Sequence, residues 1–143
     1  MQAKDVTGPA GRALLDDYVR ELHDRWTGPI LNHPDPQPLG AGLAPPHGLF
    51  LIARVDGDLA GCVGLRTLTP GIGEIKCLFV RPRFRGHGLG RRLLTAVEEA
   101  ARERGHAHLR LDTMAELVEA RSLYADAGYR DIPPYTANPY IRY

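Results

Sequence analysis

The chain has 143 residues, of which 43% are hydrophobic and 24% are charged. This length lies near the commonest size of one domain, and the composition is that of globular proteins, which excludes a disordered, collagen-like or coiled-coil chain. Eighteen Lys and Arg residues stand against seventeen Asp and Glu residues, so the formal net charge is only +1. A balance this even argues against a protein that coats nucleic acid. We expect a single domain over residues 1–143.

The N-terminal third combines one helical pattern with a long irregular stretch. Apolar residues recur every three to four positions over 14–26, which predicts an amphipathic helix. Residues 27–48 are rich in proline and glycine and exceed the usual loop limit of about 12–15 residues, which indicates a functional loop or a mobile one. Residues 1–9 lack the apolar core of a signal peptide, and no stretch approaches the ~20 apolar residues of a membrane span. We therefore expect a cytoplasmic protein with no membrane partner.

The middle of the chain reads as three consecutive strands. Apolar runs at 49–55 and 59–65 flank the turn-forming triplet Asp56-Gly57-Asp58, which predicts a β-hairpin. A second break at 69–71 leads into an apolar, β-branched run over 72–80, which ends before Pro82. These patterns predict an antiparallel meander.

The C-terminal half predicts an α/β crossover. Apolar residues on one face indicate a helix from Leu89 to near Gly105, followed by a strand over 108–113 and a helix over 115–127 that ends at Gly128. A strand, helix and strand in this order predict that 72–80 and 108–113 pair in parallel. The tail, residues 129–143, is expected to supply two short edge strands, where a homodimer could pair.

Two residue types that often bind metals or form disulfides are sparse. Cys62 and Cys77 are the only cysteines and lie in apolar runs, so we expect two reduced, buried thiols. His106 and His108 could form a metal pair, but no third ligand follows at a supporting spacing. We expect no metal.

Five arginines crowd into a dozen positions around a glycine-rich turn. Glycines at 86, 88 and 90 remove side chains where a strand enters a helix, so that backbone N–H groups can converge on a phosphate or pyrophosphate. A P-loop would need Lys-Ser/Thr after its last glycine, whereas Gly90 is followed by Arg91. A Rossmann fingerprint would need glycine at the sixth position, which is again Arg91. A purely structural turn and a nucleic-acid site remain as alternatives. The arginines are Arg81, Arg83, Arg85, Arg91 and Arg92.

The segment Arg85-Gly86-His87-Gly88-Leu89-Gly90, placed after a strand that ends Leu78-Phe79-Val80-Arg81-Pro82, resembles the acetyl-CoA signature of the GCN5-related N-acetyltransferase (GNAT) family of the acyl-CoA N-acyltransferase superfamily. The likeness spans residues 48–130 and includes Leu123-Tyr124 followed by Ala127-Gly128-Tyr129. It implies an α/β fold with a mixed, mostly antiparallel sheet splayed into a V and helices on both faces. It also implies that 27–48 is an acceptor-side loop.

The resemblance implies an N-acetyltransferase that passes an acetyl group from acetyl-CoA to a primary amine of a small molecule, or to an amino group, by direct attack on the thioester. The alternative is a non-catalytic acyl-CoA-binding or sensing module. No metal and no nucleic acid are expected to take part. By this analogy the pantetheine arm lies along Leu78, Phe79 and Val80. The implied pyrophosphate site consists of Arg85, Gly86, His87, Gly88, Leu89, Gly90 and Arg91.

Three residues take catalytic roles by the same analogy. The backbone N–H of Leu78 is expected to stabilise the oxyanion. Glu74 is expected to accept the amine proton directly or through water, its alternative being an exposed carboxylate paired with Lys76 or another cation. Tyr124 is expected to protonate the leaving thiolate, its alternative being a half-buried tyrosine of the core.

One position departs from the family pattern. Many relatives have an Asn where this chain has Leu117, which puts that cofactor contact in doubt. A subset of the family shares the stretch Leu111-Asp112-Thr113 and the segment Pro45-Pro46-His47-Gly48-Leu49-Phe50, so the departure resembles a subfamily trait. Loops carry specificity, so we expect the acceptor pocket to be shaped by 27–48 with Tyr135, Asn138 and Tyr140. The resemblance leaves the acceptor itself open.

Overall fold

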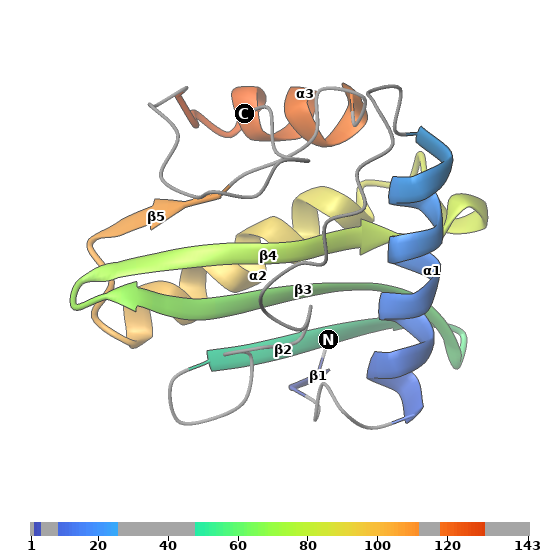
Figure 1. Ribbon diagram of the computed structural model, residues 1–143, viewed down its shortest axis with the longest axis horizontal. Coiled ribbons are helices and arrows are strands. Elements are labelled where there is room, and N and C mark those ends of the chain that lie inside the picture. The colour runs from blue at the N-terminus through green and yellow to red at the C-terminus, as the bar shows by residue number, and fades with distance from the viewer. Residues whose placement is uncertain (1, 4–8, 26–47, 112–117, 131–143) are drawn as a thin grey trace.

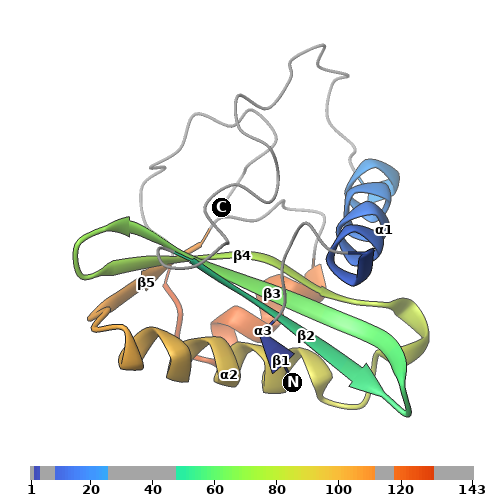
Figure 2. The ribbon, with the colours of Figure 1, turned by 90° about the horizontal axis from the view of Figure 1, so that it is seen from below.

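The computed structural model describes residues 2–3, 9–25, 48–111 and 118–130. One five-stranded sheet runs in the order β1-β2-β3-β4-β5, with α1 on one face and α2 on the other (Figures 1 and 2). No helix among the described residues is both long and apolar enough to span a bilayer. The elements are β1 (Gln2–Ala3), α1 (Pro9–Arg25), β2 (Gly48–Val55), β3 (Asp58–Thr69), β4 (Ile72–Val80), η1 (Pro82–Phe84), α2 (Leu89–Glu103), β5 (His108–Arg110) and α3 (Val118–Asp126).

The predicted hairpin is confirmed. β2 and β3 pair in antiparallel fashion around Asp56 and Gly57, both of which have positive φ (52° and 85°). Two positive φ values in a two-residue turn match the right-handed twist of the flanking strands, and the Asp-Gly pair is the usual sequence for such a turn. The third strand of the meander, β4, pairs with β3 as expected.

The predicted parallel crossover is also confirmed, and its pairing is short. β4 pairs with β5 from Ile72↔His108 to Glu74↔Arg110. Beyond Glu74, no described strand pairs with this edge of β4, although β4 continues to Val80. The two strands therefore diverge, which leaves the last six residues of β4 with one edge unpaired by the described strands.

An extra residue in β4 changes which side chains face each helix. Cys62 pairs with Phe79 and Gly64 with Lys76, so Cys77 and Leu78 both lie opposite Val63. This is a β-bulge, and Cys77 takes the positive φ (57°) that it requires. The bulge shifts the alternation by one position, so that Leu78 packs on the α2 side, whereas Phe79 packs on the α1 side.

The two faces of the sheet bury separate cores. Leu93, Leu94 and Val97 of α2 pack on one face, with side chains of α3 at their edge. Leu14 of α1 packs on the other face with Phe50, Ile52, Cys62 and Phe79. Helices on both faces of a mostly antiparallel sheet are the fold that the sequence predicts.

The predicted boundaries differ modestly from the observed ones. α1 begins five residues before Leu14, at Pro9, and α2 ends at Glu103, just before Gly105, whose φ of 80° closes it. Of the predicted strand over 108–113 and the predicted helix over 115–127, the structure describes the shorter β5 and α3. The predictions for residues 27–47 and 131–143, including the two edge strands, lie outside the described residues.

Both cysteines are free and buried, as expected. The Cys62 thiol donates a hydrogen bond to the Cys77 carbonyl at 3.4 Å. Burial, together with the neighbouring Cys77, raises the pKa of Cys62 well above its ordinary value of 9.0. A pKa raised by folding contributes stability that is present below pH 9.0 and lost as the pH rises above it.

We expect neither thiol of the native chain to react with a disulfide reagent at pH 8, because the thiolate is the reactive form and both sulfurs are buried. Two thiols should react after unfolding in guanidinium. The urea midpoint should fall between pH 8 and pH 10, and by less in a Cys62→Ala variant measured against its own value at pH 8. Rapid stoichiometric modification of a native thiol would contradict this account.

Candidate functional site

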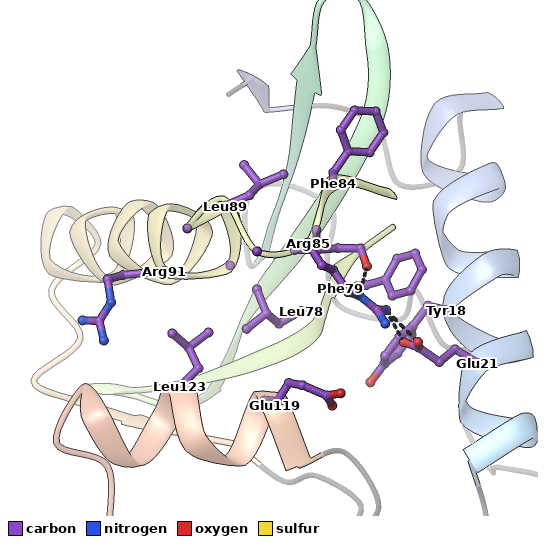
Figure 3. A pocket seen from close by; sticks show the side chains of 15 residues that line it. Tyr18, Glu21, Leu78, Phe79, Phe84, Arg85, Leu89, Arg91, Glu119 and Leu123 are labelled. Atoms are coloured by element: carbon purple, nitrogen blue, oxygen red, sulfur yellow. Dashed lines mark hydrogen bonds and ion pairs between the residues drawn. The ribbon is translucent and has the colours of Figure 1, made fainter. Parts of the chain in front are cut away.

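A pocket of about 370 Å³ lies where the end of β4 meets the start of α2, with α1 and α3 on its sides (Figure 3). Nine of the ten predicted cofactor residues line it, and the exception is His87, which is exposed. Tyr18, Glu21, Phe84, Glu119, Ala120 and Leu123 complete the lining. The structure thus brings together residues that the sequence placed in two separate motifs.

The glycine turn could present its backbone amides to an anion. Gly86 and Gly88 have φ values of 84° and 77°, a left-handed conformation that other residues adopt at a cost. Gly88 caps α2 without a side chain, and the first bond of the helix runs from the Arg92 amide to the Gly88 carbonyl at 3.1 Å. Among the described residues, no backbone carbonyl accepts from the amides of residues 86–91. These amides and the positive end of the helix dipole together suit a phosphate.

The unpaired edge of β4 faces the same pocket. The Arg81 amide donates to the Ala60 carbonyl of β3 at 2.8 Å. Successive backbone groups of a strand point to opposite edges, so the amides of Val80 and Leu78 point away from β3, towards the diverging side. A ligand with amide groups could add to this edge as an extra strand.

Most of the arginine cluster is paired with carboxylates. Arg81 Nε contacts Asp17 Oδ2 at 2.8 Å, and Arg83 Nη2 contacts Asp58 Oδ2 at 2.5 Å. Arg85 Nη2 lies 2.6 and 2.7 Å from the two carboxylate oxygens of Glu21. Three of the five positive charges are therefore compensated, which weakens the nucleic-acid alternative. The other two, Arg91 and Arg92, are exposed in the first turn of α2.

Glu74 lies on the α1 face of the sheet and is 1% exposed. Its Oε1 lies 2.5 Å from Arg66 Nε, across the β3–β4 pair, and 3.9 Å from Lys76 Nζ. The alternative of a paired carboxylate is thus correct in the pairing and wrong in the exposure. Glu74 is not among the residues that line the pocket, and its role as a proton acceptor stays a prediction.

Tyr124, on α3, is 9% exposed and belongs to the core between the sheet and α2. Its ring lies 5.7 Å from that of Tyr129, whose hydroxyl donates to Glu98 Oε2 at 3.0 Å. Burial, and then the Glu98 carboxylate, raise the pKa of Tyr129 above its ordinary value. Leu123 lines the pocket and Tyr124 does not, so the role of Tyr124 as an acid also stays a prediction. Leu78, the third catalytic candidate, lies in the pocket wall.

The two histidines lie in different surroundings, since His108 is exposed on β5 and His106 is partly buried before it. β5 begins at His108, so His106 precedes the strand, where its Nδ1 is buried and has no hydrogen-bond partner among the described residues. The described residues hold no group of three or more side chains suited to a metal ion.

The sequence did not point to the acidic residues that α1 supplies to this site. Asp17 and Glu21 are spaced four apart on the helix, as are Arg81 and Arg85 beyond β4. The equal spacing is the one signal that could have suggested the pairing. The two pairs are separated by 64 positions, so no local pattern connects them.

Open amides at a helix start, beside the unpaired edge of a strand, suit a phosphate-bearing ligand with an extended, amide-bearing arm. Comparison with known proteins gives the family. The model of the acetyltransferase (GNAT) family matches residues 13–129, so the chain belongs to this family. It is therefore an acyltransferase of the N-acetyltransferase type, and the resemblance drawn from residues 48–130 is confirmed.

Individual relatives agree with this assignment. An uncharacterized N-acetyltransferase from Schizosaccharomyces pombe is 38% identical over 130 residues, which cover 90% of this chain and 79% of that protein. A Klebsiella pneumoniae structure described as an acyl-CoA N-acyltransferase has a TM-score of 0.74 at 27% identity, covering 98% of this chain and 90% of that one. The N-acetylglutamate synthase from Neisseria gonorrhoeae, solved with coenzyme A and N-acetyl-glutamate, has a TM-score of 0.65 at 26% identity. That match covers 89% of this chain and 27% of the synthase.

Proposed function

We propose that this protein transfers an acetyl group from acetyl-CoA to a primary amine of a small molecule, or to an amino group of a larger one, by direct attack of the amine on the thioester. The observation that carries the proposal is the meeting, in one pocket, of the open amides of residues 86–91 with the unpaired edge of β4. The coenzyme A bound to the Neisseria gonorrhoeae synthase supports the choice of ligand.

The residues of the pocket fit this cosubstrate. We place the pyrophosphate at the amides from Gly86 to Arg91 and the pantetheine arm along Leu78, Phe79 and Val80. Leu78 and Val80 offer amides on the diverging edge, while their side chains give the arm an apolar wall. The exposed Arg91 adds a positive charge in the first turn of α2.

The chemistry needs a neutral amine, a donor for the oxyanion and a proton for the leaving thiolate. We assign the role of oxyanion donor to the Leu78 amide, because Leu78 lies in the part of β4 that no longer pairs with β5. We assign to Glu74 the role of accepting the proton of the amine. Its burial on the sheet face and its absence from the pocket lining favour transfer through a water molecule. Tyr124 is our candidate for the acid, because it follows Leu123 of the pocket wall.

The cosubstrate site is tested by a pair of glycine variants. Gly88 in the pocket and Gly57 in the hairpin turn have similar φ values, 77° and 85°, and an added Cβ would meet nothing within 4 Å at either place. Alanine should therefore cost each variant about 1 kcal/mol of stability from the left-handed conformation. Only Gly88→Ala should weaken coenzyme A binding, by roughly tenfold in calorimetry, because only there would a shift of the backbone move the open amides. Equal affinities for coenzyme A in the two variants would contradict the placement of the pyrophosphate at this loop.

The reaction is tested with a panel of amines and acetyl-CoA, with detection of free thiol. We expect turnover with at least one amine and binding of coenzyme A by the same preparation. Binding without turnover on any amine would favour the sensing module, and absence of binding would end the proposal.

With an accepted amine in hand, Glu74→Gln should lower kcat at neutral pH by about 10²–10⁴, the usual contribution of a general base, while the Kd for coenzyme A stays within about twofold. Tyr124→Phe should lower kcat by a similar factor without moving the Kd. The Gln variant should recover part of its rate at high pH, where the free amine no longer needs a proton acceptor. Unchanged kcat in either variant would end that assignment, provided that its thermal midpoint shows a folded protein.

A further inference from the structure

Arg85, the first residue of the glycine signature, makes contacts that lead away from the phosphate loop. Its Nε donates to the Val80 carbonyl at 2.8 Å, and its Nη2 donates to both carboxylate oxygens of Glu21 at 2.6 and 2.7 Å. Figure 3 shows the side chain extending towards Glu21 on α1, whereas Arg91 lies on the far side of Leu78. One guanidinium therefore joins the end of β4 to α1 across one side of the pocket.

The geometry of this contact suits a structural bridge. The Val80 carbonyl lies at the last residue of β4 and the contacted carboxylate lies on a separate helix, so the planar fork of Arg85 joins two elements. The Phe79 ring lies 5.8 Å below the guanidinium and limits its movement further. The Glu21 carboxylate also compensates the charge of Arg85, which reduces its attraction for a phosphate.

A second bridge lies one helical turn away and provides a comparison. Asp17 holds Arg81 at 2.8 Å, with side chains that are 30% and 29% exposed, against 20% and 32% for Glu21 and Arg85. Both bridges attach α1 to the segment between β4 and α2. Only Glu21 and Arg85 line the pocket, whereas Asp17 and Arg81 do not.

We propose that Glu21 and Arg85 are positioning residues for the cosubstrate: together they hold the end of β4 and the start of the glycine loop in the conformation that binds coenzyme A, and Arg85 does not act as a phosphate ligand. This inference rests on the proposed function, because it needs coenzyme A in this pocket. It revises the role that the sequence suggested for Arg85 and adds Glu21, which no motif contains.

The two roles of Arg85 predict opposite effects of one substitution. If Arg85 bound a phosphate, Glu21→Gln would release its charge and tighten coenzyme A binding. If Arg85 is a bridge, Glu21→Gln weakens it and loosens the strand end. Pantetheine separates the roles further, because it lacks the pyrophosphate yet should pair with the same edge of β4.

The experiment measures the Kd of coenzyme A by calorimetry, and that of pantetheine by displacement, in the full chain and three variants. Glu21→Gln and Arg85→Lys should each raise the Kd for both ligands by about five- to tenfold, since Lys keeps the charge but cannot hold both partners. Asp17→Asn should leave both Kd values within about twofold. Thermal midpoints and circular dichroism establish that each variant is folded.

Several outcomes would overturn the inference. They are tighter or unchanged coenzyme A binding in Glu21→Gln, a loss confined to coenzyme A, full retention of affinity in Arg85→Lys, and an equal loss in Asp17→Asn. Failure of the unaltered protein to bind coenzyme A would instead end the proposed function, so the two failures can be told apart.

Discussion

The β-bulge at Cys77 and Leu78 determines how β4 serves both faces of the sheet. Without the extra residue, Phe79 would share a face with Ile75 and would leave the core beneath α1. With it, Phe79 packs against Tyr18 of α1, with ring centroids 5.8 Å apart, while Leu78 and Val80 turn towards α2 and the pocket. The short pairing with β5 then leaves the edge at these residues open. The pocket wall at Leu78 and the packing of Phe79 against α1 both depend on this one irregularity in the ladder.

The elements that local chemistry determines were predictable. Asp56 and Gly57 define their own turn, and the apolar face of α2 and the closing Gly105 define a helix without reference to the rest of the chain. The glycine loop was predictable for the same reason, because left-handed backbone at Gly86 and Gly88 favours glycine whatever surrounds it. The bulge was not, because Cys77 is an ordinary strand residue whose positive φ arises from the pairing with β3.

The ionic contacts also depended on information that a local pattern lacks. A run of arginines indicates a site for anions, yet the carboxylates of Asp17, Asp58 and Glu21 compensate three of these charges from distant parts of the chain. Burial was equally hard to anticipate for Glu74, because a carboxylate in a strand is ordinarily solvated, and here the opposing Arg66 and the nearby Lys76 make its burial tolerable. Local sequence patterns therefore identify turns and helices well, but they do not show which opposite charge each charged residue pairs with.

The ion pairs Arg66–Glu74 and Glu21–Arg85 differ in how far apart their partners lie along the chain. Arg66 and Glu74 are eight residues apart and face each other across a hairpin, so pairing of β3 with β4 alone brings them together. Glu21 and Arg85 are 64 residues apart and meet only when α1 docks. Contacts of short separation cost less chain entropy to form, whereas a helix that docks from a distant part of the chain can open locally. Opening of α1 would separate Glu21 from Arg85, whereas the Arg66–Glu74 pair depends on the pairing of β3 with β4, so the two ion pairs need not be lost together.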